Sequence, residues 1–314
     1  MKKIFAAVAF AMLVTVFGAV SVSALDCKTG AGGVSIAPVS EDFSFHSGDV
    51  HEGKVKVKNI SSENDAKYRV YTAPYSAGSS DNEKDFSTAT DHTQISNWIE
   101  FEGEDGYLTE IIVSVPACTE KEVSYRVNVP SSVPAGSQHA VIFVETYKDE
   151  PSSGISSVSR AGMIVSGSAL DGETIEQAEV VDLVVENGTL DNKTGIYAQS
   201  IVKNTGNIDI ATTNELKIEN IFGQELWHDS NSIAVLPDSS HKNTIMWEDV
   251  PMLGLFKVIY TVHATGVESQ TITRFVFVCP LPLLIVVLVL VVIVIIGIIT
   301  TIKKRRIRKM RYGF

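Results

Sequence analysis

The sequence predicts an all-β chain of two tandem immunoglobulin-like β-sandwich domains, followed by one transmembrane α-helix. Three observations predict this class: short alternating segments between turn residues, a phrase that occurs twice, and an uncharged run near the C-terminus that precedes a cluster of bases. The predicted divisions are a signal peptide over 1–24, an N-terminal immunoglobulin-like domain over 25–170, a second immunoglobulin-like domain over 171–274, a transmembrane segment over 275–302 and a basic cytoplasmic tail over 303–314.

The first residues, MKKIFAAVAFAMLVTVFGAVSVSA, are typical of a secretory signal peptide. Two lysines precede an apolar run, and Val22-Ser23-Ala24 supplies small residues at the cleavage positions. The same run also fits an uncleaved signal anchor, because it is rather long. The cleaved form would place the following residues outside the cell.

The strands are predicted from alternation. VSYRVNV over 123–129 and GKVKVKN over 53–59 place apolar side chains on one face and polar side chains on the other. EGEDGY over 102–107 predicts a hairpin, because Asp105-Gly106 readily adopts the positive φ angles of a tight turn. Turn residues recur about every ten residues, as expected of a β-sandwich.

The repeated phrase indicates two related domains. Val57-Lys58-Asn59 and Val202-Lys203-Asn204 each end an alternating run before a polar turn, and the amide of each asparagine suits such a turn because it bonds the backbone and tolerates left-handed geometry. VPSSVPAGSQHAVIFVET and VPMLGLFKVIYTVHAT close the two halves in a similar way. We expect the boundary between 167 and 177, and a protruding polar loop over 75–92.

The C-terminal run carries no charge from Phe275 to Ile302, which is long enough to cross a bilayer of about 30 Å as a helix. The flanking bases are Lys303, Lys304, Arg305, Arg306, Arg308, Lys309 and Arg311. The positive-inside bias then predicts a single-pass protein of the cell membrane, with an extracellular ectodomain and a cytoplasmic tail. The tail fits either a stop-transfer anchor or a segment that binds anionic lipid.

Charge limits the partners. The whole chain is −11, but removing the two lysines of the signal and the seven bases of the tail from 26 Lys and Arg leaves 17 against 37 Asp and Glu, so the ectodomain is near −20. Such a surface repels nucleic acid. Cys27 and Cys118 are the ectodomain's cysteine pair, so they are either a disulfide or two separate thiols, and Cys279 lies at the predicted membrane edge.

The sequence predicts no catalytic, cofactor-binding or metal-binding residues, and therefore no enzyme. The histidines lack zinc-protease spacing, there is no Cys-x-x-Cys or Gly-x-Ser-x-Gly, and GAGG over 30–33 precedes a strand. Two weaker alternatives stay open, each of which has a structural explanation beside it. The first is calcium binding at Glu100, Glu102, Glu104 and Asp105, for which a solvated strand edge is the structural explanation. The second is a cluster of His46, His51 and His139, for which surface or hydrogen-bonded histidines are the structural explanation. Trp98, Phe101, Trp227 and Trp247 are expected in the cores, with an exposed binding aromatic as the alternative.

FSFHSGDVHEGKVKVKNIS, the Tyr68-x-Val-x-x-Ala-Pro stretch, Trp98 and VPSSVPAGSQHAVIFVE resemble the N-terminal domain of WxL-interacting proteins, which are surface proteins of Gram-positive bacteria. The resemblance implies a peptidoglycan-binding immunoglobulin-like domain, a second β-domain, a transmembrane helix and a basic tail. The residues that match the motif are expected to maintain the fold. They are Gly48, Asp49, Gly53, Asn59, Trp98, Pro134 and Gly136.

Two functions follow as predictions. The first is a non-enzymatic, membrane-anchored surface protein that binds the cell wall, another surface protein or both. The alternative is a membrane-tethered assembly chaperone that acts by β-strand addition. The predicted partners are the membrane and either peptidoglycan or a surface protein, with no nucleic acid and no cofactor.

Overall fold

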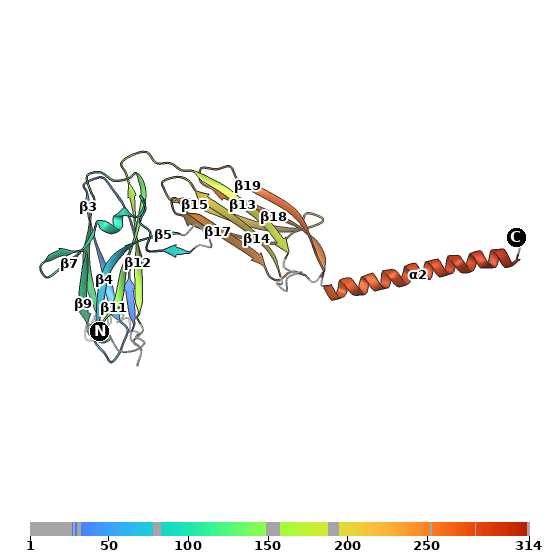
Figure 1. The fold of residues 1–314 in the computed structure, drawn as a ribbon, viewed down its shortest axis with the longest axis horizontal. Helices are drawn as coiled ribbons and strands as arrows, with labels where there is room; N and C mark the ends of the chain where they lie inside the picture. The colour runs from blue at the N-terminus through green and yellow to red at the C-terminus, as the bar shows by residue number, and fades with distance from the viewer. Residues whose placement is uncertain are drawn as a thin grey trace, which may run out of the picture.

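The structure is a computed structural model that describes residues 27, 29, 33–77, 83–148, 158–187, 195–251, 253–279 and 281–312. The signal peptide predicted over 1–24 lies outside the described residues, as do residues 30–32 of GAGG and 78–82 of the predicted polar loop. Figure 1 shows two β-sandwiches in succession and a long helix that extends away from the second. The all-β part of the prediction is confirmed for the described residues before that helix.

The first sandwich packs two five-stranded sheets face to face. One sheet has the order β1 (Val34–Ala37), β3 (Val50–Asn59), β10 (Glu120–Asn128), β7 (Ile99–Gly103) and β8 (Gly106–Leu108). The other has the order β2 (Ser40–Phe45), β12 (Arg160–Ala169), β11 (Gly136–Tyr147), β4 (Ala66–Pro74) and β9 (Glu110–Val115). The predicted loop contributes the short pair β5 (Ser76–Ala77) and β6 (Lys84–Asp85), and the 3₁₀ turn η1 (Gln94–Asn97) precedes β7.

Alternation explains how these strands bury a core. The odd-numbered residues of β10 from Val123 to Val127 are buried between the sheets, and Tyr125 and Phe101 face each other across β10 and β7. Trp98 packs edge-on against Phe45, with ring centroids 5.8 Å apart. This tryptophan therefore serves as a core aromatic, as the first of its two interpretations expected.

The second sandwich pairs a three-stranded sheet with a four-stranded one. The three-stranded sheet has the order β13 (Ala178–Asn187), β14 (Ile196–Asn204) and β17 (Ser240–Trp247). The four-stranded sheet has the order β16 (Glu225–Val235), β15 (Ile210–Asn220), β18 (Gly254–Ala264) and β19 (Gln270–Val278). Its own hydrophobic cluster includes Trp247 and Tyr260, and Trp227 is partly buried against it.

The repeated phrase has the same structural role in both sandwiches. The Asn59 amide nitrogen donates to the carbonyl oxygens of Asn64 at 2.8 Å and Val115 at 3.1 Å, and the Ser61 N–H donates to its side-chain oxygen at 3.0 Å. The side chain thus joins its own turn to the end of β9. Asn59 is fully buried and is not among the described residues with positive φ, so the left-handed geometry that the sequence analysis allowed is not used.

Asn204 repeats this arrangement in the second sandwich. Its amide nitrogen donates to the carbonyl oxygens of Ile208 at 2.7 Å and Val235 at 2.9 Å, and the Gly206 N–H donates to its side-chain oxygen at 2.9 Å. Asn204 is also fully buried. The two asparagines therefore hold equivalent turns against equivalent strand ends.

Residues from both sandwiches meet at one junction. The Ser137 N–H donates to the Asn207 carbonyl at 2.9 Å, and the His139 Nε2 lies 2.8 Å from the Asp209 carboxylate. Gly136 has φ +103°, and a Cβ there would lie 1.9 Å from the Asn207 carbonyl oxygen. A glycine is therefore required for this close approach.

The C-terminal region differs from the prediction in its boundaries. Residues 275–278, assigned to the membrane segment, are the last residues of β19 and pair with β18, where Val278 lies opposite Gly254. Helix α2 (Leu281–Tyr312) then continues through the predicted tail, so the backbone of 303–312 is helical and belongs to the same element. The bases Lys303 and Lys304 are exposed on it, and the side chains of Arg305, Arg306, Arg308, Lys309 and Arg311 lie outside the description.

The predicted transmembrane segment over 275–302 is corrected by a second finding. Within the part of the chain that the structure describes, no helix has the length and apolar character that crossing a membrane requires. The predicted fold class is therefore wrong in its last element, the transmembrane helix. The predicted single-pass placement in the cell membrane, with an extracellular ectodomain and a cytoplasmic tail, is corrected with it because it depended on that segment.

Candidate functional site

The predicted cysteine pair is a disulfide in the structure. Cys27 and Cys118 are bonded, with their Cα atoms 5.8 Å apart. The bond joins the chain before β1 to the loop between β9 and β10. Cys118 itself has φ +56°, and its N–H donates to the Ser61 carbonyl at 2.8 Å, so this loop is also held by the turn that follows β3.

The histidines have separate partners. His51 lies 2.7 Å from Glu41 and stacks on Phe43, while His46 lies 3.7 Å from Asp49. His139 is buried at the junction, so these contacts favour the structural interpretation of all three histidines over a cluster. Among the described residues, no group of three or more His, Cys, Asp or Glu side chains is placed to hold a metal ion.

The four carboxylates beside Trp98 divide into two groups. Glu100 accepts hydrogen bonds from Arg126 at 2.8 Å and from Asn128 at 2.7 Å, and so it belongs to the outer face of the sheet. Glu102, Glu104 and Asp105 line a groove together with apolar side chains. This groove is the candidate site, and we call it the β10 groove.

The β10 groove exists because β10 has one incomplete edge. On one side, β10 pairs with β3 along its whole length, from Glu120 to Asn128. On the other side, β7 pairs only with residues 125–127. Residues 120–124 therefore have no strand partner on that side among the described residues.

The departure of β7 from β10 follows from its hairpin. β7 pairs with β8 from Phe101 to Gly103 and turns back at Asp105-Gly106, where Gly106 has φ +123°. This is the turn that the sequence predicted. A chain that turns so soon after Phe101 cannot continue along β10. The strand that follows the β7–β8 hairpin, β9, joins the opposite sheet beside β4.

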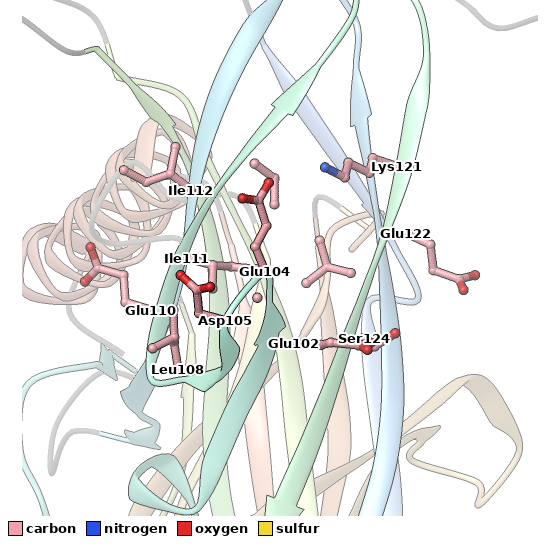
Figure 2. Close-up of a pocket in the computed structure, with 13 residues that line it drawn as sticks. Glu102, Glu104, Asp105, Leu108, Glu110, Ile111, Ile112, Lys121, Glu122 and Ser124 are labelled. Carbon is pink, nitrogen blue, oxygen red and sulfur yellow. The ribbon is translucent and has the colours of Figure 1, made fainter.

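The groove lies between the hairpin, β9 and the open part of β10, and has a volume of about 650 Å³. Ile111, Val113 and Val123 form its buried apolar floor, while Leu108 and Ile112 are about half exposed at its edge. Figure 2 shows Lys121 directed toward the hairpin and Glu122 directed away from it. This opposition is the ordinary alternation of a strand, so an added neighbour would meet Lys121 and the apolar floor on one face and the carboxylate of Glu122 on the other.

The charged rim is mostly acidic. Lys54 donates to Glu122 at 2.7 Å, and this hydrogen bond lowers the pKa of the Glu122 carboxyl. Arg69 lowers the pKa of Glu110 in the same way, with a hydrogen bond of 2.6 Å. Both groups therefore remain ionised in neutral and mildly acidic solution. Sequence reasoning predicted the hairpin and the alternation of β10, but it gave no signal for where their pairing ends.

No family model matches this chain, and no curated protein matches it. Solved structures that overlap it include the class 5 fimbriae chaperone CfaA, with 14% identity over 79% of this chain and 100% of that chain and a TM-score of 0.38. Another is the Salmonella enterica SafB chaperone in complex with the SafA pilin, with 12% identity over 80% of this chain and 100% of that chain and a TM-score of 0.32. A third is the E. coli chaperone DraB, with 10% identity over 77% of this chain and 98% of that chain and a TM-score of 0.32.

Proposed function

We propose that this chain is a non-enzymatic assembly chaperone that binds an extended segment of a partner protein by adding it as a strand to β10. Of the two predicted functions, this is the strand-addition alternative without the membrane tether. The predicted binding of peptidoglycan and the resemblance to WxL-interacting proteins stay predictions.

The observation that carries the proposal is the incomplete edge of β10 beside an apolar groove. Strand addition needs unpaired backbone groups for affinity and a surface that selects alternate side chains. Residues 120–124 supply the first, since β7 stops pairing at Tyr125. Val123 of β10 and, from the facing sheet, Ile111 and Val113 of β9 supply the second.

The dimensions fit a short strand. A segment of five residues is about 17 Å long at roughly 3.3 Å per residue. The groove's volume of about 650 Å³ lies within the range of about 300–1,000 Å³ that is usual for ligand sites. An exposed strand edge also invites uncontrolled pairing, and the neighbouring charges of Lys54 and Glu122 are a common protection against it.

Site-specific photo-crosslinking tests the proposal in cells that produce the chain. A benzophenone amino acid replaces Ser124 beside the open edge, and a matched control replaces exposed Glu268 in the second sandwich. We expect Ser124 to capture one extended segment of a partner protein, and that partner to aggregate in cells without this chain. Equal capture at both positions, or a partner that stays soluble alone, would contradict the proposed function.

A further inference from the structure

We propose that the β10 groove selects a partner segment with basic side chains at alternate positions on its outer face and apolar side chains between them. This inference rests on the proposed function and adds the chemistry of the occupant. It follows from the side chains that β10 presents and from the strand that already covers its other edge.

β10 presents two acidic side chains on its outer face next to the open edge. Glu120 and Glu122 are both exposed there, and both lie on the part of β10 that β7 leaves unpaired. On the inner face of the same stretch, Lys121 is exposed and directed toward the hairpin, and the next inner residue, Val123, is buried. An added strand therefore places alternate side chains beside two carboxylates and the intervening ones beside Lys121 and over the apolar floor that includes Val123.

Strand β3 shows which pattern β10 accepts. Across their shared edge, Lys58 lies opposite Glu120 and Lys56 lies opposite Glu122. Val57 lies between these pairs and Val55 follows the second, and both point inward and are fully buried. Glu120 and Glu122 lean toward β3, where they pair with Lys56 and Lys54, but they stand on the outer face of the central strand, so a strand at the open edge also has them as its nearest outer-face neighbours.

The lysines of β3 do not remove this preference. Strands in a sheet are about 4.8 Å apart, so an added strand lies at about 4.8 Å from β10 and at about 9.6 Å from β3. The lysine side chains of β3 nevertheless reach these carboxylates, since Lys54 lies 2.7 Å from Glu122 and Lys56 lies 3.8 Å from Glu120. All four side chains are about half exposed, so a base on the added strand can share each carboxylate with a β3 lysine. Glu102, Glu104 and Asp105 on the hairpin add negative charge, against one base, Lys121, on the groove wall.

The test uses three synthetic peptides with blocked ends. The first, GKVKVKN, has the sequence of residues 53–59, and its counterparts GQVQVQN and GEVEVEN replace all lysines with glutamine or glutamate. Binding to the whole chain is measured by calorimetry at two salt concentrations. Hydrogen exchange reports in parallel whether residues 120–124 become protected.

We expect the lysine peptide to bind at least about tenfold more tightly than the glutamate peptide, since opposite charges stabilise cross-strand pairs and like charges oppose them. The double variant Glu120→Gln, Glu122→Gln should remove most of this difference. The control Glu248→Gln, Glu268→Gln in the second sandwich should retain it. Added salt should weaken the lysine peptide most.

The outcomes separate the two proposals. Protection of 120–124 by all three peptides with equal affinity would overturn the charge preference and leave strand addition intact. Protection by none of them would overturn strand addition at this edge, and the preference with it. Tight binding of the lysine peptide without protection of 120–124 would show an electrostatic contact elsewhere and would also overturn the inference.

Discussion

Two buried asparagines close equivalent turns in the two sandwiches, and both should be essential for stability. Replacing Asn59 or Asn204 with alanine leaves buried carbonyl groups at Val115 or Val235 without this donor. An unsatisfied buried group costs about 1–3 kcal/mol. Urea unfolding should therefore show losses of roughly that size, against almost none for the exposed control Asn97→Ala. Losses below about 0.5 kcal/mol would contradict this role.

The lowered pKa of Glu122 gives a second prediction for a single residue. Lys54→Gln removes the hydrogen bond that lowers this pKa, so the pKa should rise toward its ordinary value of 4.5. Because the folded-state pKa lies below the unfolded one, the pair stabilises the fold at neutral pH and this contribution is lost as the pH falls through the acidic range. Carboxyl titration by NMR measures the shift, with Glu268 as the control. An unchanged Glu122 pKa would exclude Lys54 as the cause.

The loops that follow β9 and β16, whose last residues the two asparagines contact, differ in how far the sequence predicts them. The sequence shows Val-Lys-Asn as a repeat. The two loops, PACT over 116–119 and LPDS over 236–239, share little sequence. In the structure Cys118 and Asp238 both have φ +56°, and the following Thr119 and Ser239 each donate a backbone hydrogen bond to the residue three positions earlier. Different side chains adopt equivalent backbone geometry in the two loops, so their equivalence cannot be recognised by comparing the two sequence segments.

At the scale of elements, β10 and β3 have different neighbours although both alternate regularly. β3 pairs with β10 over residues 50–58 and with β1 over 56–59, whereas β10 pairs with β7 only over 125–127 and is open along 120–124. Alternation predicts which face of a strand is buried. It cannot predict where a neighbouring strand departs, because that depends on the hairpin turn and on the sheet that β9 joins. The β10 groove was therefore not predictable from β10 itself.

The disulfide connects elements of the first sandwich only. It spans a sequence separation of 91 residues, for which the chain-entropy model gives a stabilisation on the order of 4 kcal/mol. Cys27→Ser with Cys118→Ser should lower the unfolding transition of the first sandwich and leave the second almost unchanged. Calorimetry of the oxidised and double-serine chains measures this. Equal destabilisation of both sandwiches would show that they unfold as one unit.

At the scale of the whole molecule, the junction sets how the two sandwiches are connected. Gly136→Ala places a Cβ 1.9 Å from the Asn207 carbonyl oxygen, so we expect the junction to open and the connecting segment 170–177 to be cleaved faster by protease. Gly223→Ala is a matched control, because Gly223 also has positive φ but has nothing within 4 Å of an added Cβ. Similar cleavage rates in the two variants would show that backbone strain, and not the junction contact, is responsible.

The sequence predicted the succession of alternating strands and the repeat, and the described strands form two sandwiches with separate hydrophobic clusters. The boundaries predicted for the C-terminal region were wrong, because an apolar run alone does not show where strand β19 ends and helix α2 begins. Residues 275–278 are as apolar as those after them, yet they complete β19 by pairing with β18. Pairing between distant segments decides such boundaries.

Strand addition to β10 can be tested by N-methylating the bound peptide at one position at a time. Use of the tightest-binding peptide of the three described above makes the test independent of the charge preference. In an added strand, alternate N–H groups face β10 and the others face away. We predict that a single methyl group on any N–H that faces β10 abolishes binding and the protection of 120–124 from hydrogen exchange. These positions should alternate along the peptide, and a methyl group at a position between them should have little effect. A uniform response along the peptide, or protection located outside 120–124, would contradict strand addition.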